Sequence, residues 1–297
     1  MSTIDEKIRL AAFDWLKIQT PLHDGTLDIN LLRKGFEFGN ERISLVAPQG
    51  IFKPKLMNLP LTITTAPKSR YEDALRSDGL FNYKYRGENI NSWDNVGLRE
   101  CMKQRIPIIY FLGLVPSKYL PIWPAYIIAD QPENLTFIVK SEMFEGVIRE
   151  EYRVYERDMA KQYANSSIRI RIHQKAFRER VLHAYRTQCS ICRLRHSELL
   201  DAAHIIPDSD SQSAPSVDNG IALCKIHHAA FDKYFIGITP DYKVEVRKDV
   251  LEEEDGPMLQ HGLKELHNSK IYIPKLVVNR PNRDYLDIRY QKYLNAI

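Results

Sequence analysis

The stretch that decides the fold is Cys189-Ser190-Ile191-Cys192, followed by Asp201-Ala202-Ala203-His204, Asp218-Asn219-Gly220 and Leu223-Cys224-Lys225-Ile226-His227-His228-Ala229-Ala230-Phe231-Asp232. Two cysteines at Cys-x-x-Cys spacing can hold one tetrahedral Zn²⁺ from a tight turn, and a second pair of ligands must then come from elsewhere. Cys224-x-x-His227 supplies that pair. The alternative is that the thiols are free and buried. Because three of the four cysteines fall in this stretch, we predict a structural zinc site. Its ligands are Cys189, Cys192, Cys224 and His227.

Three polar residues are left over from the predicted zinc site and need a second role. His204 ends an apolar segment that reads as a short strand running into a loop. His228 and Asp232 lie four residues apart in a helix expected to begin near Cys224, so they project from one face. A histidine and a carboxylate on one helical face, opposite a histidine on a strand, predict an open site for a divalent metal ion.

These motifs together resemble an HNH, or ββα-metal, nuclease domain, in the subclass C-x-x-C, D-A-A-H-I-x-P, N-G, L-C-x-x-H-H-x-x-F-D. The resemblance covers about 60 residues. It implies that His204 is the general base that activates water, and that His228 and Asp232 ligate a catalytic Mg²⁺ or Mn²⁺. It also implies that Asn219 braces the loop carrying the base or touches the metal. Many relatives carry His or Asp directly before the base, where this chain has Ala203. The third protein ligand is therefore either Asp201 or replaced by water.

The chain has a formal net charge of +4, and its basic residues gather just before the predicted nuclease core. Between residues 168 and 199 there are eight Lys and Arg against two Glu. Such a run can neutralise phosphates. The alternative is a solvated helix face whose buried stripe is Phe177, Val181 and Ala184. We predict contacts to the DNA backbone from Arg169, Arg171, Lys175 and Arg178.

The first half of the chain has a different pattern. Thr3-x-x-Glu6 is a capping box that predicts an amphipathic helix with Ile8, Ala12, Trp15 and Leu16 on its buried face. Short β-like runs separated by Gly, Pro and Asn then predict a mostly β domain. They are residues 43–46, 61–65, 106–114, 125–128 and 135–139. We place this domain at residues 1–140, a charged and partly helical linker at 141–172, and the nuclease domain at 173–297.

Aromatic residues in the first half are interleaved with charged and small ones. They occur in Tyr71-Glu72-Asp73, in the run from Gly79 to Gly87, in Trp93-Asp94-Asn95-x-x-Leu98 and in the run from Pro107 to Gly113. Their order is similar to that of SRA domains of the PUA-like superfamily. That resemblance spans about 80 residues and implies a pocket for a flipped modified cytosine. Its lining would be Tyr71, Asp73 and Tyr85. The alternative is that these tyrosines pack a β domain, as aromatic residues often do.

The sequence thus predicts an α+β protein in which a PUA/SRA-like barrel precedes a zinc-stabilised ββα-metal domain. The expected function is that of a DNA endonuclease that reads 5-methylcytosine or 5-hydroxymethylcytosine in double-stranded DNA and cleaves nearby. Three alternatives stay open: cleavage of unmodified or phosphorothioate DNA, a catalytically dead DNA-binding protein, and an RNA-directed nuclease. One HNH site cuts one strand, so a homodimer is one route to a double-strand break. The sequence contains no run of 18 apolar residues and no signal peptide at its start, and we expect a cytoplasmic protein without a membrane partner.

Overall fold

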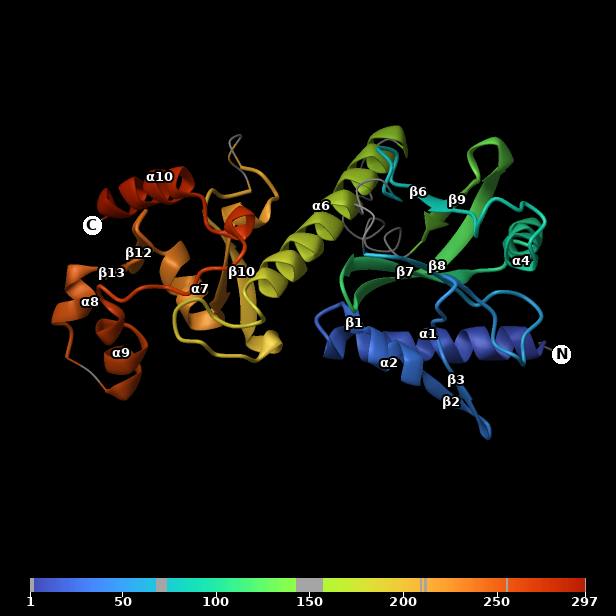
Figure 1. Ribbon diagram of the computed structural model, residues 1–297, viewed down its shortest axis with the longest axis horizontal. Coiled ribbons are helices and arrows are strands. Elements are labelled where there is room, and N and C mark those ends of the chain that lie inside the picture. Colours follow the sequence, from blue (N-terminus) through green and yellow to red (C-terminus); the bar gives the residue numbers. More distant parts are fainter. Residues whose placement is uncertain are drawn as a thin grey trace. The chain divides into compact units, whose positions relative to one another are not determined.

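The computed structural model describes residues 3–67, 74–142, 157–208, 210, 213–254 and 256–296, with the side chains of 157–169 left out. The chain divides into two compact units, residues 1–172 and 173–297. Figure 1 shows both, with helix α6 (Arg157–Ala184) running from the first into the second. Each unit mixes helices with strands, so the predicted α+β class is confirmed. Among the described residues no helix is both long and apolar enough to cross a bilayer.

The first unit is built on a curled sheet with the strand order β4-β5-β7-β8-β9-β6, and β1 adds to β8. Strands β5 and β7 are parallel, while the other pairs are antiparallel. The strands are β1 (Leu27–Asp28), β4 (Ile51–Phe52), β5 (Thr62–Thr65), β6 (Phe81–Lys84), β7 (Ile108–Val115), β8 (Lys118–Gln131) and β9 (Thr136–Ser141). A separate hairpin consists of β2 (Phe36–Phe38) and β3 (Glu41–Ile43). Among its described residues, the first unit also contains the helices α1 (Ile4–Leu22), α2 (Ile29–Lys34) and α4 (Trp93–Lys103) and the first half of α6.

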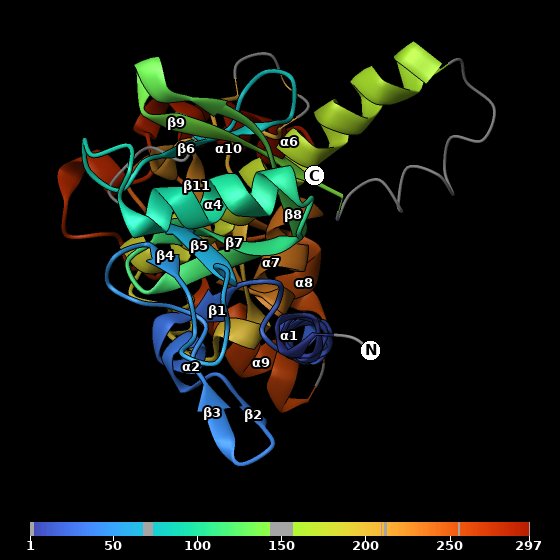
Figure 2. The same cartoon turned by 90° about the vertical axis from the view of Figure 1, so that its right-hand side faces the viewer.

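The apolar strand β7 is the centre of this unit, and every residue of it is buried. Because successive side chains of a strand point to opposite faces, Ile109 and Phe111 belong to the core that α1 completes, while Tyr110 contacts Phe81 and Tyr83 edge-on. Helix α1 runs beneath β7 and β8 in Figure 1, and α4, which is seen in Figure 2, packs against β8. Strand β7 is therefore buried on both faces.

The predicted capping box at the start of α1 is confirmed. The Glu6 amide donates to Thr3 Oγ1 at 3.3 Å, and the Thr3 amide donates to Glu6 Oε2 at 2.8 Å. Ile8, Ala12 and Leu16 are fully buried, as the helical spacing predicts.

The sheet differs from the predicted barrel in being a curled half-barrel, which ends in β4 and β6. Its outer strands are short, and they do not pair with each other to close a barrel. The predicted runs 61–65, 106–114 and 135–139 correspond to β5, β7 and β9. The run predicted at 125–128 is part of a longer strand, β8, which also contains Pro121 and Pro124. Proline has no amide hydrogen to donate to a ladder, so the extension could not be predicted from the residue pattern.

The second unit is organised around an antiparallel pair, β10 (Leu200–His204) and β11 (Gly220–Cys224), followed at once by α7 (Lys225–Asp232). The C-terminal half of α6 packs on this pair through Phe177 and Val181. A methyl group at Gly220 would lie 2.5 Å from Val181 Cγ2 and 2.8 Å from Phe177 Cζ, so only glycine lets α6 approach β11 this closely. The other elements of the unit are β12 (Ile236–Ile238), β13 (Val244–Val246), α8 (Lys248–Glu252), α9 (Pro257–Gly262) and α10 (Arg283–Leu294).

Candidate nuclease site and zinc cluster

The four predicted zinc ligands come together in the second unit. Cys189, Cys192, Cys224 and His227 place their ligand atoms within 4.8 Å of one another. The His227 Nδ1 atom lies 3.2 Å from Cys224 Sγ and 3.5 Å from Cys189 Sγ. Within the described ranges this is the one group of three or more His, Cys, Asp and Glu side chains that meets this distance. A Cys₃His cluster of soft ligands fits a closed tetrahedral Zn²⁺ site.

The cluster is held by residues far from the motif. His227 Nε2 lies 2.8 Å from the carbonyl oxygen of Gly262, at the end of α9. A hydrogen bond from Nε2 leaves Nδ1 free to ligate, which is the usual way in which an outer group fixes the tautomer of a metal-binding histidine. Between the two cysteines of the Cys-x-x-Cys turn, Ser190 donates its hydroxyl to the carbonyl of Tyr272 at 2.6 Å and accepts the Tyr272 amide on its own carbonyl. The C-terminal segment thus fastens the turn that carries Cys189 and Cys192.

His204 lies at the last position of β10, where the predicted strand runs into a loop. Its imidazole stacks flat on the ring of Phe177, with ring centroids 4.0 Å apart and planes 8° from parallel. This contact comes from α6 and fixes the plane of the imidazole. Burial of the ring lowers the pKa of His204. The neighbouring His228 also lowers this pKa, whereas the carboxylates of Asp208 and Asp232 raise it. A lowered pKa keeps the imidazole neutral near pH 7, the form that can accept a proton.

Asn219 lies fully buried just before β11. Both the oxygen and the nitrogen of its side-chain amide form hydrogen bonds with the loop that follows His204. Its Oδ1 accepts the Ile206 amide at 2.8 Å, and its Nδ2 donates to the Ile206 carbonyl, the Ser213 hydroxyl and the Ala214 carbonyl at 3.0–3.1 Å. With both donors and the acceptor committed, Asn219 is placed to brace the loop. This geometry favours bracing over contact with the metal, the two roles that the sequence left open.

His228 and Asp232 lie on one face of α7, and His228 Nε2 is 3.1 Å from Asp232 Oδ2. On the other side of the ring, His228 Nδ1 is 3.6 Å from Asp201 Oδ2. Asp201 also pairs with Lys225 and has Arg178 Nε at 3.5 Å. Although burial alone raises the pKa of Asp201, hydrogen bonds from His228 and Lys225 hold it well below its usual range. The carboxylate therefore stays charged and is engaged by three side chains.

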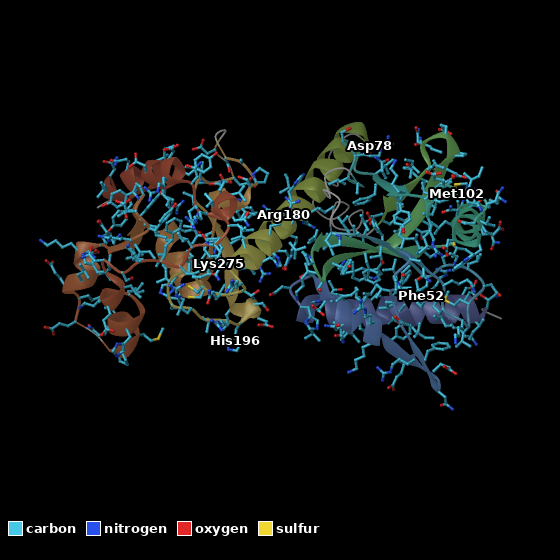
Figure 3. The ribbon with its side chains drawn as sticks, in the orientation of Figure 1. Phe52, Asp78, Met102, Arg180, His196 and Lys275 are labelled. Carbon is cyan, nitrogen blue, oxygen red and sulfur yellow. The ribbon has the colours of Figure 1, made fainter. Side chains whose placement is uncertain are left out.

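The predicted phosphate contacts fall into different environments. Arg178 donates to the carbonyls of Ser197 and Leu200 at 2.8 and 3.0 Å and pairs with Glu179 at 2.9 Å, with only 14% of its side chain exposed. It is thus committed to the protein interior and is not presented to a phosphate. Arg171 is exposed on α6, and Lys175 is half-buried. The side chain of Arg169 lies outside the described residues. Figure 3 labels Arg180, a further basic residue of α6, and His196 in the loop after the Cys-x-x-Cys turn.

The first unit contains a cavity of about 770 Å³ beside β6. Tyr85, one of the three predicted pocket residues, lies in its wall. Tyr71 and Asp73 lie outside the described residues. The Tyr85 ring stacks on Phe137 with centroids 4.5 Å apart, and its hydroxyl donates to Asp130. Tyr85 is therefore fixed by packing and by a hydrogen bond at the cavity.

The D-N-x-x-L motif has a structural role next to this cavity. Buried Asp94 pairs with Arg86, which lines the cavity. Asn95 accepts the Arg86 amide at 3.0 Å and donates to the Asn89 carbonyl at 3.0 Å, so it shapes the loop after β6. The motif thereby positions the end of the strand that forms one cavity wall.

Comparison with protein-family models finds a match within the second unit. A family model described as HNH endonuclease matches residues 189–239. This match identifies an HNH endonuclease domain at residues 189–239 and supports a metal-dependent nuclease. No curated protein matches the chain. Among solved structures, a chain described as a modification dependent TagI restriction endonuclease is similar at 14% identity and a TM-score of 0.29, with 79% of this chain and 81% of that chain covered. A TM-score of that size does not establish a shared overall fold.

Proposed function

We propose that the protein is a modification-dependent DNA endonuclease, in which the first unit reads a modified cytosine and the HNH domain cleaves a phosphodiester nearby. The observation that carries the catalytic half is the placement of a flat-stacked, half-buried His204 at the end of β10 together with the His228–Asp232 pair on α7. Both elements are joined through β11 in one ββα unit. The general base and the metal-binding pair are thus supplied by neighbouring elements of one small core.

The donor set of α7 fits a hard divalent cation. His228 Nε2 and Asp232 Oδ2 are 3.1 Å apart, so one nitrogen and one oxygen donor face the same region. We assign the pair as ligands of Mg²⁺ or Mn²⁺, with water completing the coordination. When bound, such a cation would stabilise the negative charge that develops on the phosphate. We assign Asp201 as the group that orients His228, because its oxygens are shared among Lys225, Arg178 and His228 Nδ1.

The proposed chemistry requires His204 to be neutral. Its imidazole takes a proton from a water molecule as the water oxygen attacks phosphorus and the bond to the 3′ oxygen breaks. Phe177 keeps the imidazole plane fixed during this transfer, and Asn219 holds the loop that follows. The products are a 5′ phosphate and a 3′ hydroxyl. The Cys₃His cluster, which we assign to Zn²⁺, stabilises the fold and takes no part in the reaction.

We assign base reading to the cavity beside β6. A volume of about 770 Å³ lies within the range of small-molecule sites and exceeds what a single base needs. Tyr83 and Tyr85 supply aromatic walls. Thr64 belongs to the lining of the cavity, and its hydroxyl is buried without a hydrogen-bond partner among the described residues. A buried unpaired hydroxyl is costly, and we propose that a base that enters the cavity reaches it with a polar edge. This support is independent of the SRA resemblance.

DNA contact outside the cavity is proposed for Arg169, Arg171 and Lys175, which precede the cutting site in sequence. Arg178 is excluded from that set because the protein interior already uses it. Since one HNH domain carries one active site, cleavage of both strands requires a second copy of the chain or a second binding event.

The reader assignment is tested by binding of the zinc-loaded protein without added Mg²⁺ or Mn²⁺, where we expect no cleavage. We expect the full-length protein to bind a duplex containing 5-methylcytosine or 5-hydroxymethylcytosine at least about tenfold more tightly than the unmodified duplex. Thr64→Val should weaken binding of the modified duplex about fivefold, the effect of losing one hydrogen bond. Thr20→Val is the matched control, because the Thr20 hydroxyl is also buried and unpaired yet lies in α1, outside the cavity. Equal affinity for modified and unmodified duplexes would contradict base reading.

A further inference from the structure

We infer that Arg289 of α10 is a positioning residue of the nuclease site, which sets the orientation of the Asp232 carboxylate and ties it to the backbone that follows His204. This inference rests on the proposed catalytic function and adds a residue that lies 50 positions beyond the end of the matched HNH segment, 189–239. Only 6% of Arg289 is exposed, so this arginine belongs to the interior of the domain.

The guanidinium of Arg289 joins two parts of the site. Nη1 donates to the carbonyl of Ile205, the residue directly after His204, at 3.4 Å. Nη2 donates to the carbonyl of Phe231 at 3.0 Å and to Asp232 Oδ1 at 3.2 Å. A planar fork of donors suits this task, because it can engage several acceptors in fixed relative directions. One side chain therefore spans the end of β10 and the end of α7.

The surroundings of Arg289 restrict its movement. Its guanidinium carbon lies 4.1 Å from the centroid of the Phe231 ring and 5.2 Å from that of Tyr234. A buried charge is expensive unless it is paired, and the carboxylate that pairs with it is that of Asp232. The aromatic contacts and the ion pair together explain why a charged residue is retained inside this small domain.

The pairing has a consequence for metal binding. Asp232 Oδ1 accepts a hydrogen bond from Arg289, while Asp232 Oδ2 faces His228 Nε2 at 3.1 Å. Asp201 holds the opposite nitrogen of the same imidazole. Both proposed ligands are therefore oriented from outside, His228 by Asp201 and Asp232 by Arg289. Outer groups of this kind typically change metal affinity or activity by about 10- to 100-fold when they are removed.

The test compares full-length, zinc-loaded variants. Arg289→Met keeps the aliphatic contact with the two rings and removes the donors, and Arg289→Lys keeps the charge but not the fork. Arg283→Met is the matched control, because Arg283 begins the same helix with 63% of its side chain exposed and its nearest acid 3.6 Å away. Zinc content reports folding of the domain, Mn²⁺ affinity is measured from the electron paramagnetic resonance signal of free Mn²⁺, and plasmid cleavage reports activity.

We expect Arg289→Met to retain one zinc, to bind Mn²⁺ about tenfold more weakly and to cleave at least tenfold more slowly at sub-saturating Mn²⁺. Arg289→Lys should fall between it and the wild type, and Arg283→Met should match the wild type. Removing a positive charge would by itself strengthen cation binding, so weaker binding reports orientation and not charge.

Wild-type or tighter Mn²⁺ binding by Arg289→Met would overturn the inference. If that variant loses its zinc, Arg289→Lys decides: wild-type Mn²⁺ affinity there would overturn the inference, and weaker affinity with zinc retained would support it. Failure of the wild-type protein itself to bind Mn²⁺ and cut DNA would instead contradict the proposed function.

Discussion

Replacing His204 with alanine is expected to abolish DNA cleavage while DNA binding and zinc content stay at the wild-type level. The imidazole ends β10 and is held flat against Phe177, the position from which we propose it accepts the proton of the attacking water. Loss of a positioned general base typically costs about 100- to 10,000-fold in rate. The measurement is the initial rate of plasmid cleavage, with gel-shift binding without added Mg²⁺ or Mn²⁺ and the zinc content determined on the same preparations.

The control is His183→Ala, since His183 is exposed on the same helix as Phe177 and makes no proposed contribution to catalysis. The wild-type pH profile provides a second readout. Burial lowers the pKa of His204 below its ordinary 6.5, and a protonated imidazole cannot accept a proton. We therefore expect kcat/KM to be level at neutral pH and to fall as pH decreases through a midpoint below 6.5. Wild-type cleavage by His204→Ala would show that the base is another group.

Replacing Cys192 with serine is expected to remove zinc and unfold the second unit. Cys192 is the exposed member of the Cys₃His cluster, and its Sγ lies 3.9 Å from Cys224 Sγ. A serine hydroxyl is a poor zinc ligand, and structural zinc sites contribute apparent binding free energies of about 10–16 kcal/mol to folding. That figure exceeds the total stability of most domains. The measurements are zinc stoichiometry and limited proteolysis, which should cut the chain within residues 173–297.

Cys101→Ser is the matched control for zinc loss. Cys101 is the cysteine of the first unit, and burial raises the pKa of its thiol to about 11. The Cys101→Ser variant should retain one zinc per chain, and in the wild type the Cys101 thiol should react slowly with alkylating agents. A Cys192→Ser protein with a full zinc complement and an unchanged melting temperature would contradict the structural role of the cluster.

The local part of the nuclease site could be predicted from sequence because the chemistry fixes the spacing. A Cys-x-x-Cys turn, a strand that ends in His204 and a helix that begins after Cys224 involve only near neighbours, and all three elements are present. The sequence could not show which residues of distant segments would form hydrogen bonds with the site residues. Gly262 holds the imidazole of His227, and Arg289 holds Asp232. Neither residue belongs to a motif, and only the tertiary fold brings them to the site.

Two further features of the second unit could not be predicted because they also depend on the tertiary fold. Phe177 was assigned to a buried helical stripe, which is correct, yet no periodicity could show that His204 would stack on it. Arg178 was predicted to contact DNA, because charge alone does not distinguish an exposed arginine from one that satisfies backbone carbonyls. In the first unit, the apolar runs predicted β5, β7, β9 and part of β8, and the shorter strands were not predicted. Closure of a barrel depends on pairing between distant strands, and the sequence could not decide it.

The most direct test of the account is cleavage of one plasmid prepared in unmodified, 5-methylcytosine-containing and 5-hydroxymethylcytosine-containing forms, with Mg²⁺ or Mn²⁺ and an EDTA control. We predict cleavage that requires the divalent ion and is confined to modified DNA. Equal cleavage of all three plasmids would contradict base reading by the first unit, and intact DNA under every condition would contradict the nuclease assignment itself.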